Sequence, residues 1–295
     1  MIHFIRKNFK QATFIIYKLP HNTLQSFNPS GGKFAYVDER IIENKPSYWQ
    51  LSEQDLVTTE NPVAYTLQPL YEDNLREDIL YFAYNDQPPE PYRQKLDGSH
   101  SKAKLLRTQS AGVHDNKTTK WMNSYADVKE LADNNFLEEY RTLKEPLASK
   151  SGHFLWAYAK PAAAGTDLYA GALFGDLGEP IVVQSWRNGP GRNLNTNEEV
   201  FDIFYMVLKF GEDNYAAFSA TVDHSKWAFT TESDIFCFCS SNRKESQEKR
   251  GGEALCFDND VVKALFCSGV KAAHPHINCN NERKRHRIER ERGPA

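Results

Sequence analysis

The stretch Asp223-His224-Ser225-Lys226-Trp227 decides how the rest of this sequence is interpreted, and it has a partial counterpart at His100-Ser101-Lys102. In an extended segment alternate side chains point to the same side, so a His-x-Lys triplet places an imidazole and an ammonium group on one face. Two such triplets together would supply two imidazoles for proton transfer or attack and two lysines to neutralise a phosphodiester oxyanion, without a metal ion or other cofactor. A single such triplet more often consists of polar side chains that are exposed to solvent and have no chemical role, so the rest of the chain has to decide between the two interpretations.

Length and composition indicate a globular protein. With 295 residues, of which 40% are hydrophobic and 13% aromatic, the chain is large enough for one sizeable domain or for two fused halves. The formal net charge of -3 argues against a protein that coats nucleic acid by bulk electrostatics. Binding of a polyanion therefore requires a local basic patch, and a nuclease is not excluded.

The first 12 residues carry Arg6, Lys7 and Lys10 and contain no apolar run long enough for a signal-peptide core or a membrane span. We therefore expect no export signal in the sequence as written and no membrane span. The oligomeric state does not follow from the sequence.

The five cysteines all lie in the last quarter of the chain, and their odd number leaves at least one unpaired in an oxidising compartment. A zinc site is a less favoured alternative, because its candidate ligands lack the usual C-x2-C spacing. Those candidates are Cys237, Cys239, His274, His276 and Cys279.

Runs rich in β-branched and aromatic residues predict strands, most clearly where a proline or a turn sequence follows them. Such runs lie at residues 13–19, 33–38, 78–84, 180–186, 200–210 and 215–222, and an amphipathic helix is predicted at 167–174. Asn85, Asp86 and Gln87 follow one predicted strand, where polar side chains either face a site or make a turn. Lys160 is a lone lysine, which is expected on a solvated face.

Several short blocks resemble, in their order and spacing, the signature blocks of the deoxyribonuclease II family. They are Tyr17-Lys18-Leu19-Pro20, Tyr36-Val37-Asp38-Glu39, Leu67-Gln68-Pro69-Leu70-Tyr71 and Tyr84-Asn85-Asp86-Gln87-Pro88-Pro89, followed by the two His-x-Lys motifs. Asn242-Arg243 and Arg250-Gly251-Gly252 resemble the C-terminal region of that family. The resemblance covers most of residues 14–256.

The resemblance implies an α/β fold of the phospholipase D-like superfamily, with two pseudo-repeated sandwich halves in one chain and the active site between them. The expected N-terminal half is 1–145, with an altered segment at 108–145, and the expected C-terminal half is 146–280. Residues 281–295 are dense in Arg and Glu and are expected to form a disordered tail.

The resemblance also implies a hydrolase that takes part in DNA catabolism. The expected enzyme is a metal-independent acid endodeoxyribonuclease that leaves 3′-phosphate ends through a phosphohistidine. His100 is the expected nucleophile, His224 the acid, and Lys102 and Lys226 the ligands of the phosphate oxygens. The expected substrate-binding or supporting residues are Asn85, Asp86, Gln87 and Trp227. A Cys237–Cys256 disulfide and a lysosomal or secreted location follow from the same resemblance.

The first motif differs from the family pattern. Ser99 separates Gly98 from His100, Ala103 stands where the family has glycine, and Lys104 and Arg107 interrupt the aliphatic run. The alternative function is therefore a degenerate, catalytically inactive relative that binds DNA. A phosphodiesterase acting on a lipid headgroup is the third and least favoured possibility.

Overall fold

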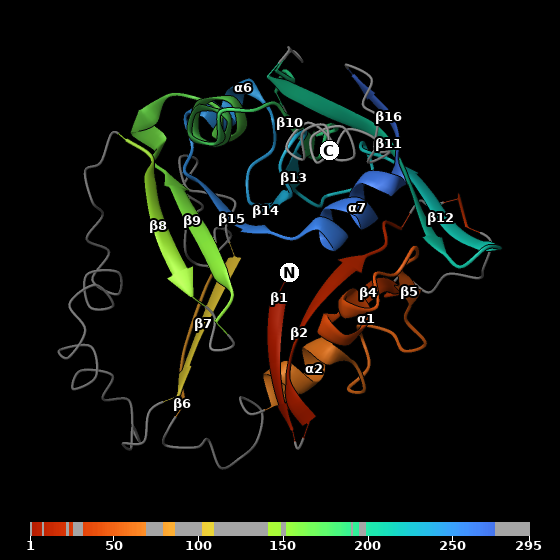
Figure 1. Ribbon diagram of the computed structural model, residues 1–295. Coiled ribbons are helices and arrows are strands. Elements are labelled where there is room, and N and C mark those ends of the chain that lie inside the picture. The colour runs from red at the N-terminus through yellow and green to blue at the C-terminus, as the bar shows by residue number, and fades with distance from the viewer. Residues whose placement is uncertain are drawn as a thin grey trace, which may run out of the picture.

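The structure is a computed structural model, shown in Figure 1. It describes the backbone of residues 2–7, 9–21, 24–25, 32–68, 79–85, 102–108, 141–148, 152–189, 191–194 and 199–274. Side chains are described within 14–21, 32–68, 141–148, 152–189, 191–194 and 199–273.

A 10-stranded sheet is the centre of the described structure. Its strands run in the order β3-β12-β11-β10-β13-β14-β15-β9-β8, and β16 pairs with β11. In chain order the bounds are β3 (Leu24–Gln25), β8 (Leu143–Ala148), β9 (Phe154–Lys160), β10 (Ile181–Gln184), β11 (Val200–Phe210), β12 (Asn214–Ser219), β13 (Trp227–Thr230), β14 (Ile235–Cys239), β15 (Gly252–Asp258) and β16 (Val270–His274). Among these pairs only β10 and β11 run parallel.

The centre of this sheet is covered on both faces. Every residue of β10 is buried, which explains why its sequence is an uninterrupted apolar run rather than an alternating one. Val182 packs into the core on the side of α7 (Asp260–Gly269), whereas Ile181 and Val183 pack on the opposite side. That second side is covered by η3 (Leu168–Phe174), a wide helical segment that continues into α5 (Gly175–Leu177).

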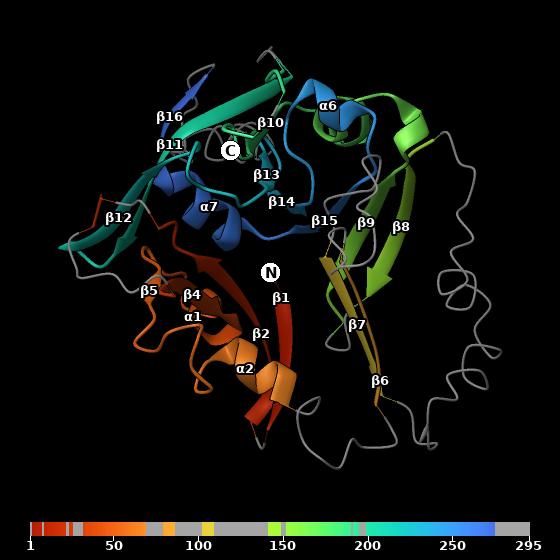
Figure 2. The ribbon, with the colours of Figure 1, turned by 180° about the vertical axis from the view of Figure 1, so that it is seen from behind.

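The N-terminal part forms a separate 4-stranded sheet in the order β1-β2-β4-β5. Its strands are β1 (Ile2–Lys7), β2 (Phe9–Lys18), β4 (Phe34–Asp38) and β5 (Gln50–Leu51), with the short helices α1 (Glu39–Glu43) and α2 (Pro62–Leu67). Both views in Figures 1 and 2 place α7 between this sheet and the large one. Phe266 of α7 contacts Tyr17 of β2 on one side and Trp227 of β13 on the other.

A third, two-stranded sheet pairs β6 (Ile79–Asn85) with β7 (Lys102–Thr108) in antiparallel orientation. The strand predicted at 78–84 is therefore confirmed within one residue. β7 also forms across Lys104 and Arg107, because the hydrogen bonds that pair two strands come from the backbone and do not depend on the side chains. The register places Asn85 opposite Lys102.

The mixed α/β class predicted from the sequence is confirmed. The strand predicted at 200–210 has the bounds of β11, and those predicted at 33–38 and 180–186 contain β4 and β10. The division at residue 145 stays a prediction, and β8 extends across it. Within the described ranges, no helix has the length and apolar character to span a bilayer.

The prediction for Lys160 is wrong. Its side chain is 2% exposed, and its Nζ donates hydrogen bonds to the carbonyl oxygens of Glu248, at 3.1 Å, and Arg250, at 2.6 Å. Glu248 ends α6 (Glu245–Glu248), so its carbonyl has no partner within the helix and is available to the ammonium group. The lysine is buried because backbone oxygens replace its water ligands.

Candidate active site

The second His-x-Lys motif lies in the loop that connects β12 to β13. The side chains of this loop alternate, as expected for an extended segment: Asp223 is buried and His224 is exposed. Lys226 donates from its Nζ to the backbone oxygen of His224 at 2.8 Å. The imidazole of His224 and the ammonium group of Lys226 therefore belong to one short segment at the surface. Asp223, the residue before the histidine, anchors this segment in the interior.

The anchor is a buried hydrogen-bond network around Asp223. Ser225 donates to the Asp223 carboxylate from its backbone N at 2.9 Å and from its Oγ at 2.7 Å. The hydroxyl of Tyr17, on β2, donates to the same carboxylate and lies 2.9 Å from Ser225 Oγ. Asp223 is 2% exposed and Tyr17 4%. A strand of the N-terminal sheet thus fixes a loop that follows it by 206 residues.

Burial and three neighbouring charges set the pKa of His224. Its pKa is lowered by burial first, then by the ammonium groups of Lys226 and Lys18, and Asp223 opposes them. The pKa of Asp223 itself is raised, because burial outweighs the hydrogen bonds from Tyr17 and Ser225 that favour the carboxylate. The neutral imidazole is therefore favoured near neutral pH, and the protonated form requires a more acidic solution.

Trp186 lies against the imidazole of His224. The two ring centroids are 3.9 Å apart and the planes are inclined by 26°, so the rings are stacked. The indole Nε1 donates to the backbone oxygen of Thr221 at 2.9 Å. Nothing in the local sequence marks Trp186 as a neighbour of the motif, because it reaches His224 only through the pairing of the strands.

A buried cluster of charges supports the segment behind Trp186. Arg243 binds Asp202 at 2.6 Å and lies 3.4 Å from Asp167, while Arg187 binds the other oxygen of Asp202 at 3.2 Å. Burial raises the pKa of both Asp167 and Asp202, and Arg243 opposes that shift. Arg243 therefore neutralises two buried carboxylates, one of which, Asp202, lies on β11.

Trp227 is 1% exposed and packs its ring against Phe236 and Phe266. It therefore supports the motif from the hydrophobic core, and its side chain is not accessible to a substrate. The sequence pattern did not separate these two roles, because an aromatic residue after a polar motif is compatible with either.

The remaining predicted residues are described only in part. Lys102 begins β7 and Asn85 ends β6, so the backbone register brings these two positions together. Their side chains, together with His100, Asp86 and Gln87, lie outside the described residues, as do most of the altered segment 108–145 and the tail 281–295.

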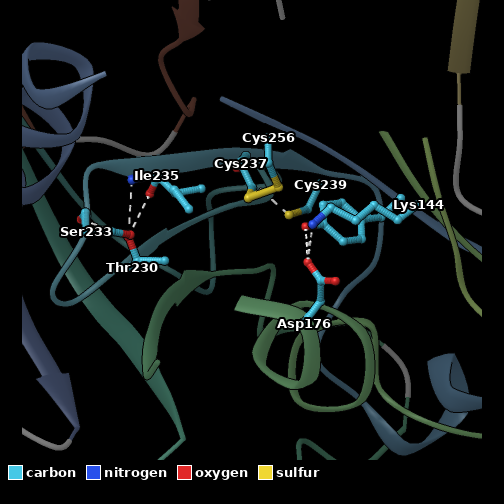
Figure 3. Close-up of a disulfide and its surroundings, with 9 residues drawn as sticks. Lys144, Asp176, Thr230, Ser233, Ile235, Cys237, Cys239 and Cys256 are labelled. Atoms are coloured by element: carbon cyan, nitrogen blue, oxygen red, sulfur yellow. Dashed lines mark hydrogen bonds and ion pairs between the residues drawn. A yellow bond between two sulfur atoms is a disulfide. The ribbon is translucent and has the colours of Figure 1, made fainter. Parts of the chain in front are cut away.

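The predicted disulfide between Cys237 and Cys256 is present (Figure 3). The two residues are directly opposite in the β14–β15 pair, with their Cα atoms 4.0 Å apart. Cys237 is therefore not a thiolate ligand, and the alternative zinc set is wrong at that position. Cys239 is a free thiol whose pKa is raised by burial. Within the described ranges, no three His, Cys, Asp or Glu side chains are grouped to hold a metal ion.

Comparison with known proteins identifies the family of this α/β chain. The family described as Deoxyribonuclease II matches residues 12–119 and 113–276. The chain belongs to the deoxyribonuclease II family.

Curated relatives match over nearly their whole length. Deoxyribonuclease-2-alpha of Rattus norvegicus is 26% identical, over 89% of this chain and 91% of the relative. Plancitoxin-1 of Acanthaster planci is 27% identical, over 91% of this chain and 90% of the relative. Cell-death-related nuclease 7 of Caenorhabditis elegans is 25% identical, over 89% of this chain and 84% of the relative.

Proposed function

We propose that this protein is a metal-independent endodeoxyribonuclease that hydrolyses DNA under acidic conditions and leaves 3′-phosphate ends. Membership of the deoxyribonuclease II family and relatives that carry the name Deoxyribonuclease-2-alpha support DNA as the substrate. The observation that carries the proposal is the solvent-facing His224, which is anchored through Asp223 and lies in one short segment with Lys226.

In the proposed first step, a neutral His100 attacks phosphorus and the P–O5′ bond breaks. The departing 5′-oxygen takes a proton from His224, and the phosphoryl group, still attached to the 3′-oxygen, is now bonded to His100. In the second step, water attacks that phosphorus and the neutral His224 takes its proton. The P–N bond then breaks and releases the 3′-phosphate end. Lys102 and Lys226 neutralise the non-bridging oxygens in both steps.

The charges around His224 support an acidic working range. The acid in the first step is the protonated imidazole, and its pKa lies below its ordinary value of 6.5 because of burial and the nearby Lys226 and Lys18. The protonated fraction falls as pH rises through that lowered pKa, so cleavage weakens well before neutrality. A lysosomal or secreted location is part of this proposal, and the Cys237–Cys256 disulfide favours an oxidising compartment.

The second candidate function is DNA binding without cleavage. Its support is the first motif, where Ser99 and Ala103 depart from the family pattern around His100. In this case the basic residues of the site hold the phosphodiester backbone, but no phosphohistidine forms.

One experiment separates the two functions. Supercoiled plasmid is incubated with the protein at acid pH in EDTA, and cleavage, the chemistry of the new ends and DNA retention are measured. The nuclease produces nicks with 3′-phosphate ends, and His100→Ala and His224→Ala both lose them. Retention of DNA without nicking supports the second function. Cleavage that requires added divalent ions overturns the metal-independent mechanism.

A further inference from the structure

Trp186 is held in place by contacts that do not involve His224. It follows β10 by two residues, and its Nε1 donates to the oxygen of Thr221 in the segment after β12. On the indole, Cε3 and Cζ3 lie against Gly189, where an added Cβ would be 3.0 Å from each of these atoms. Such a distance is tighter than ordinary van der Waals contact, so a side chain at 189 would displace the indole by a few tenths of an ångström.

The loop that carries Gly189 is itself tied down. Lys244 is buried, and its Nζ donates to the backbone oxygens of Gly191 at 3.1 Å and Arg187 at 3.4 Å. The backbone N of Arg187 donates to the oxygen of Ala220 at 3.2 Å. The indole therefore stands on a fixed loop and presents one face to the imidazole of His224 at 3.9 Å.

We infer that Trp186 is the positioning residue of His224: its indole face sets the plane of the imidazole and stabilises the imidazolium form. The role of His224 as the acid rests on the proposed function. A stacked ring restricts rotation of the imidazole about its side-chain bonds, which prepares one orientation of the N–H group for proton donation. The negative face of an indole also attracts a cation within about 6 Å.

The indole contact matters because the other charges at His224 act in opposite directions. Lys226 on the same loop and Lys18 on β2 disfavour the imidazolium, and Asp223 favours it. Without the aromatic face, Asp223 alone opposes the two ammonium groups, and the imidazolium form of His224 is less stable. Removal of the face while an apolar group of similar volume remains should lower the pKa of His224 by roughly half a unit.

Fluorescence tests the contact directly. A protonated imidazole quenches the emission of an indole stacked on it, whereas a neutral imidazole quenches it much less. The wild-type protein should therefore show emission that rises with pH through the pKa of His224, and both Trp186→Phe and His224→Gln should lose this transition. Because the chain contains 5 tryptophans, Trp156→Phe on β9 is the matched control and should retain it. A transition that persists in Trp186→Phe overturns the inference.

A second pair of variants avoids changing either ring. Gly189→Ala forces the indole to move, and it should reduce the amplitude of the transition. Gly175→Ala is its control, because an added Cβ at that position meets nothing within 4 Å. Equal amplitudes in the two variants contradict the inference.

Histidine NMR and cleavage kinetics then test the role in catalysis. Compared with Trp186→Phe, which keeps an aromatic face in a side chain of similar volume, Trp186→Leu should show a lower pKa of His224, an equal shift of the alkaline limb of the pH–rate profile, where His224 loses its proton, and a lower kcat. Fluorescence and NMR do not depend on DNA cleavage, so they test the role of Trp186 independently of the proposed nuclease function. An intact transition in a protein that does not cleave DNA refutes the proposed function alone. Cleavage with the same His224 pKa in Trp186→Leu and Trp186→Phe refutes the role of Trp186 alone.

Discussion

Replacing Tyr17 with Phe removes one buried hydroxyl and leaves the aromatic ring. The ring keeps its packing against Phe218 and Phe266, with centroid distances of 5.9 Å in both cases. Asp223 keeps the two donors of Ser225 but loses the tyrosine hydroxyl that reaches it from β2. A hydrogen bond to a buried charged group contributes about 1.5–3 kcal/mol, so Tyr17→Phe should lower the free energy of unfolding by about that amount near neutral pH.

The pH dependence of this loss has a definite sign. The folded-state pKa of Asp223 is raised above its ordinary value of 3.8, so the folded protein holds this proton more tightly than the unfolded chain does. Ionisation of Asp223 therefore reduces stability as pH rises from about 3.9 through the folded-state pKa. Tyr17 lowers that pKa, and its removal raises it further. The loss of stability in Tyr17→Phe should accordingly be small in strong acid and grow towards neutral pH.

Urea unfolding at acid and neutral pH measures this loss, and Tyr36→Phe is the matched control. The Tyr36 hydroxyl also donates to a buried carboxylate, that of Asp38, at 3.2 Å. Asp38 keeps Arg40 at 2.7 Å and the backbone N of Ile41 at 3.0 Å, so this variant should lose less stability. It should also leave the titration of His224 unchanged. A Tyr17→Phe protein that loses no more stability than Tyr36→Phe at neutral pH would refute the anchoring of the motif by β2.

Three further predictions concern the sheet that carries the site. Asp202→Asn leaves the buried Arg243 guanidinium without its closest carboxylate, so the free energy of unfolding in urea should fall by about 3–5 kcal/mol. Lys160→Met keeps the length of the side chain but removes its hydrogen bonds to two carbonyl oxygens, and thermal or urea unfolding should show a loss of about 1–3 kcal/mol. The Cys237→Ala, Cys256→Ala double variant opens a loop with a sequence separation of 19, and its unfolding free energy should fall by about 3 kcal/mol relative to the oxidised protein. Losses below about 0.5 kcal/mol would contradict each assignment in turn.

The strands were predictable where burial on both faces leaves a local pattern. The apolar run at 180–186 contains β10, because continuous burial of a strand is visible as continuous hydrophobicity. The 200–210 run corresponds to β11 and was predicted from its alternation, since exposed residues interrupt the buried ones along that strand. The alternation within the His-x-Lys motif predicted only that His224 and Lys226 share a face, and the buried anchor Asp223 was found from the structure.

The rest depends on contacts between distant segments. Tyr17 meets Asp223 across 206 residues, and Lys160 meets carbonyl oxygens 88 and 90 residues away. A lysine that binds backbone oxygens has no residue pattern at its partners, since any residue can supply a carbonyl. Trp186 reaches His224 only because β10 and β13 are neighbours in the sheet. The disulfide was predicted from the family resemblance, because spacing alone left the pairing of five cysteines open.

Plasmid cleavage in EDTA, followed as a function of pH for wild type, His224→Ala and His153→Ala, tests the proposed role of the second His-x-Lys motif most directly. His153 is a matched control because it is also an exposed histidine, located just before β9. Wild type and His153→Ala should cleave in acid and lose activity as His224 deprotonates, and His224→Ala should be slower by about 10²–10⁴-fold at acid pH. Cleavage by His224→Ala at the wild-type rate would contradict the assignment of His224 as the acid.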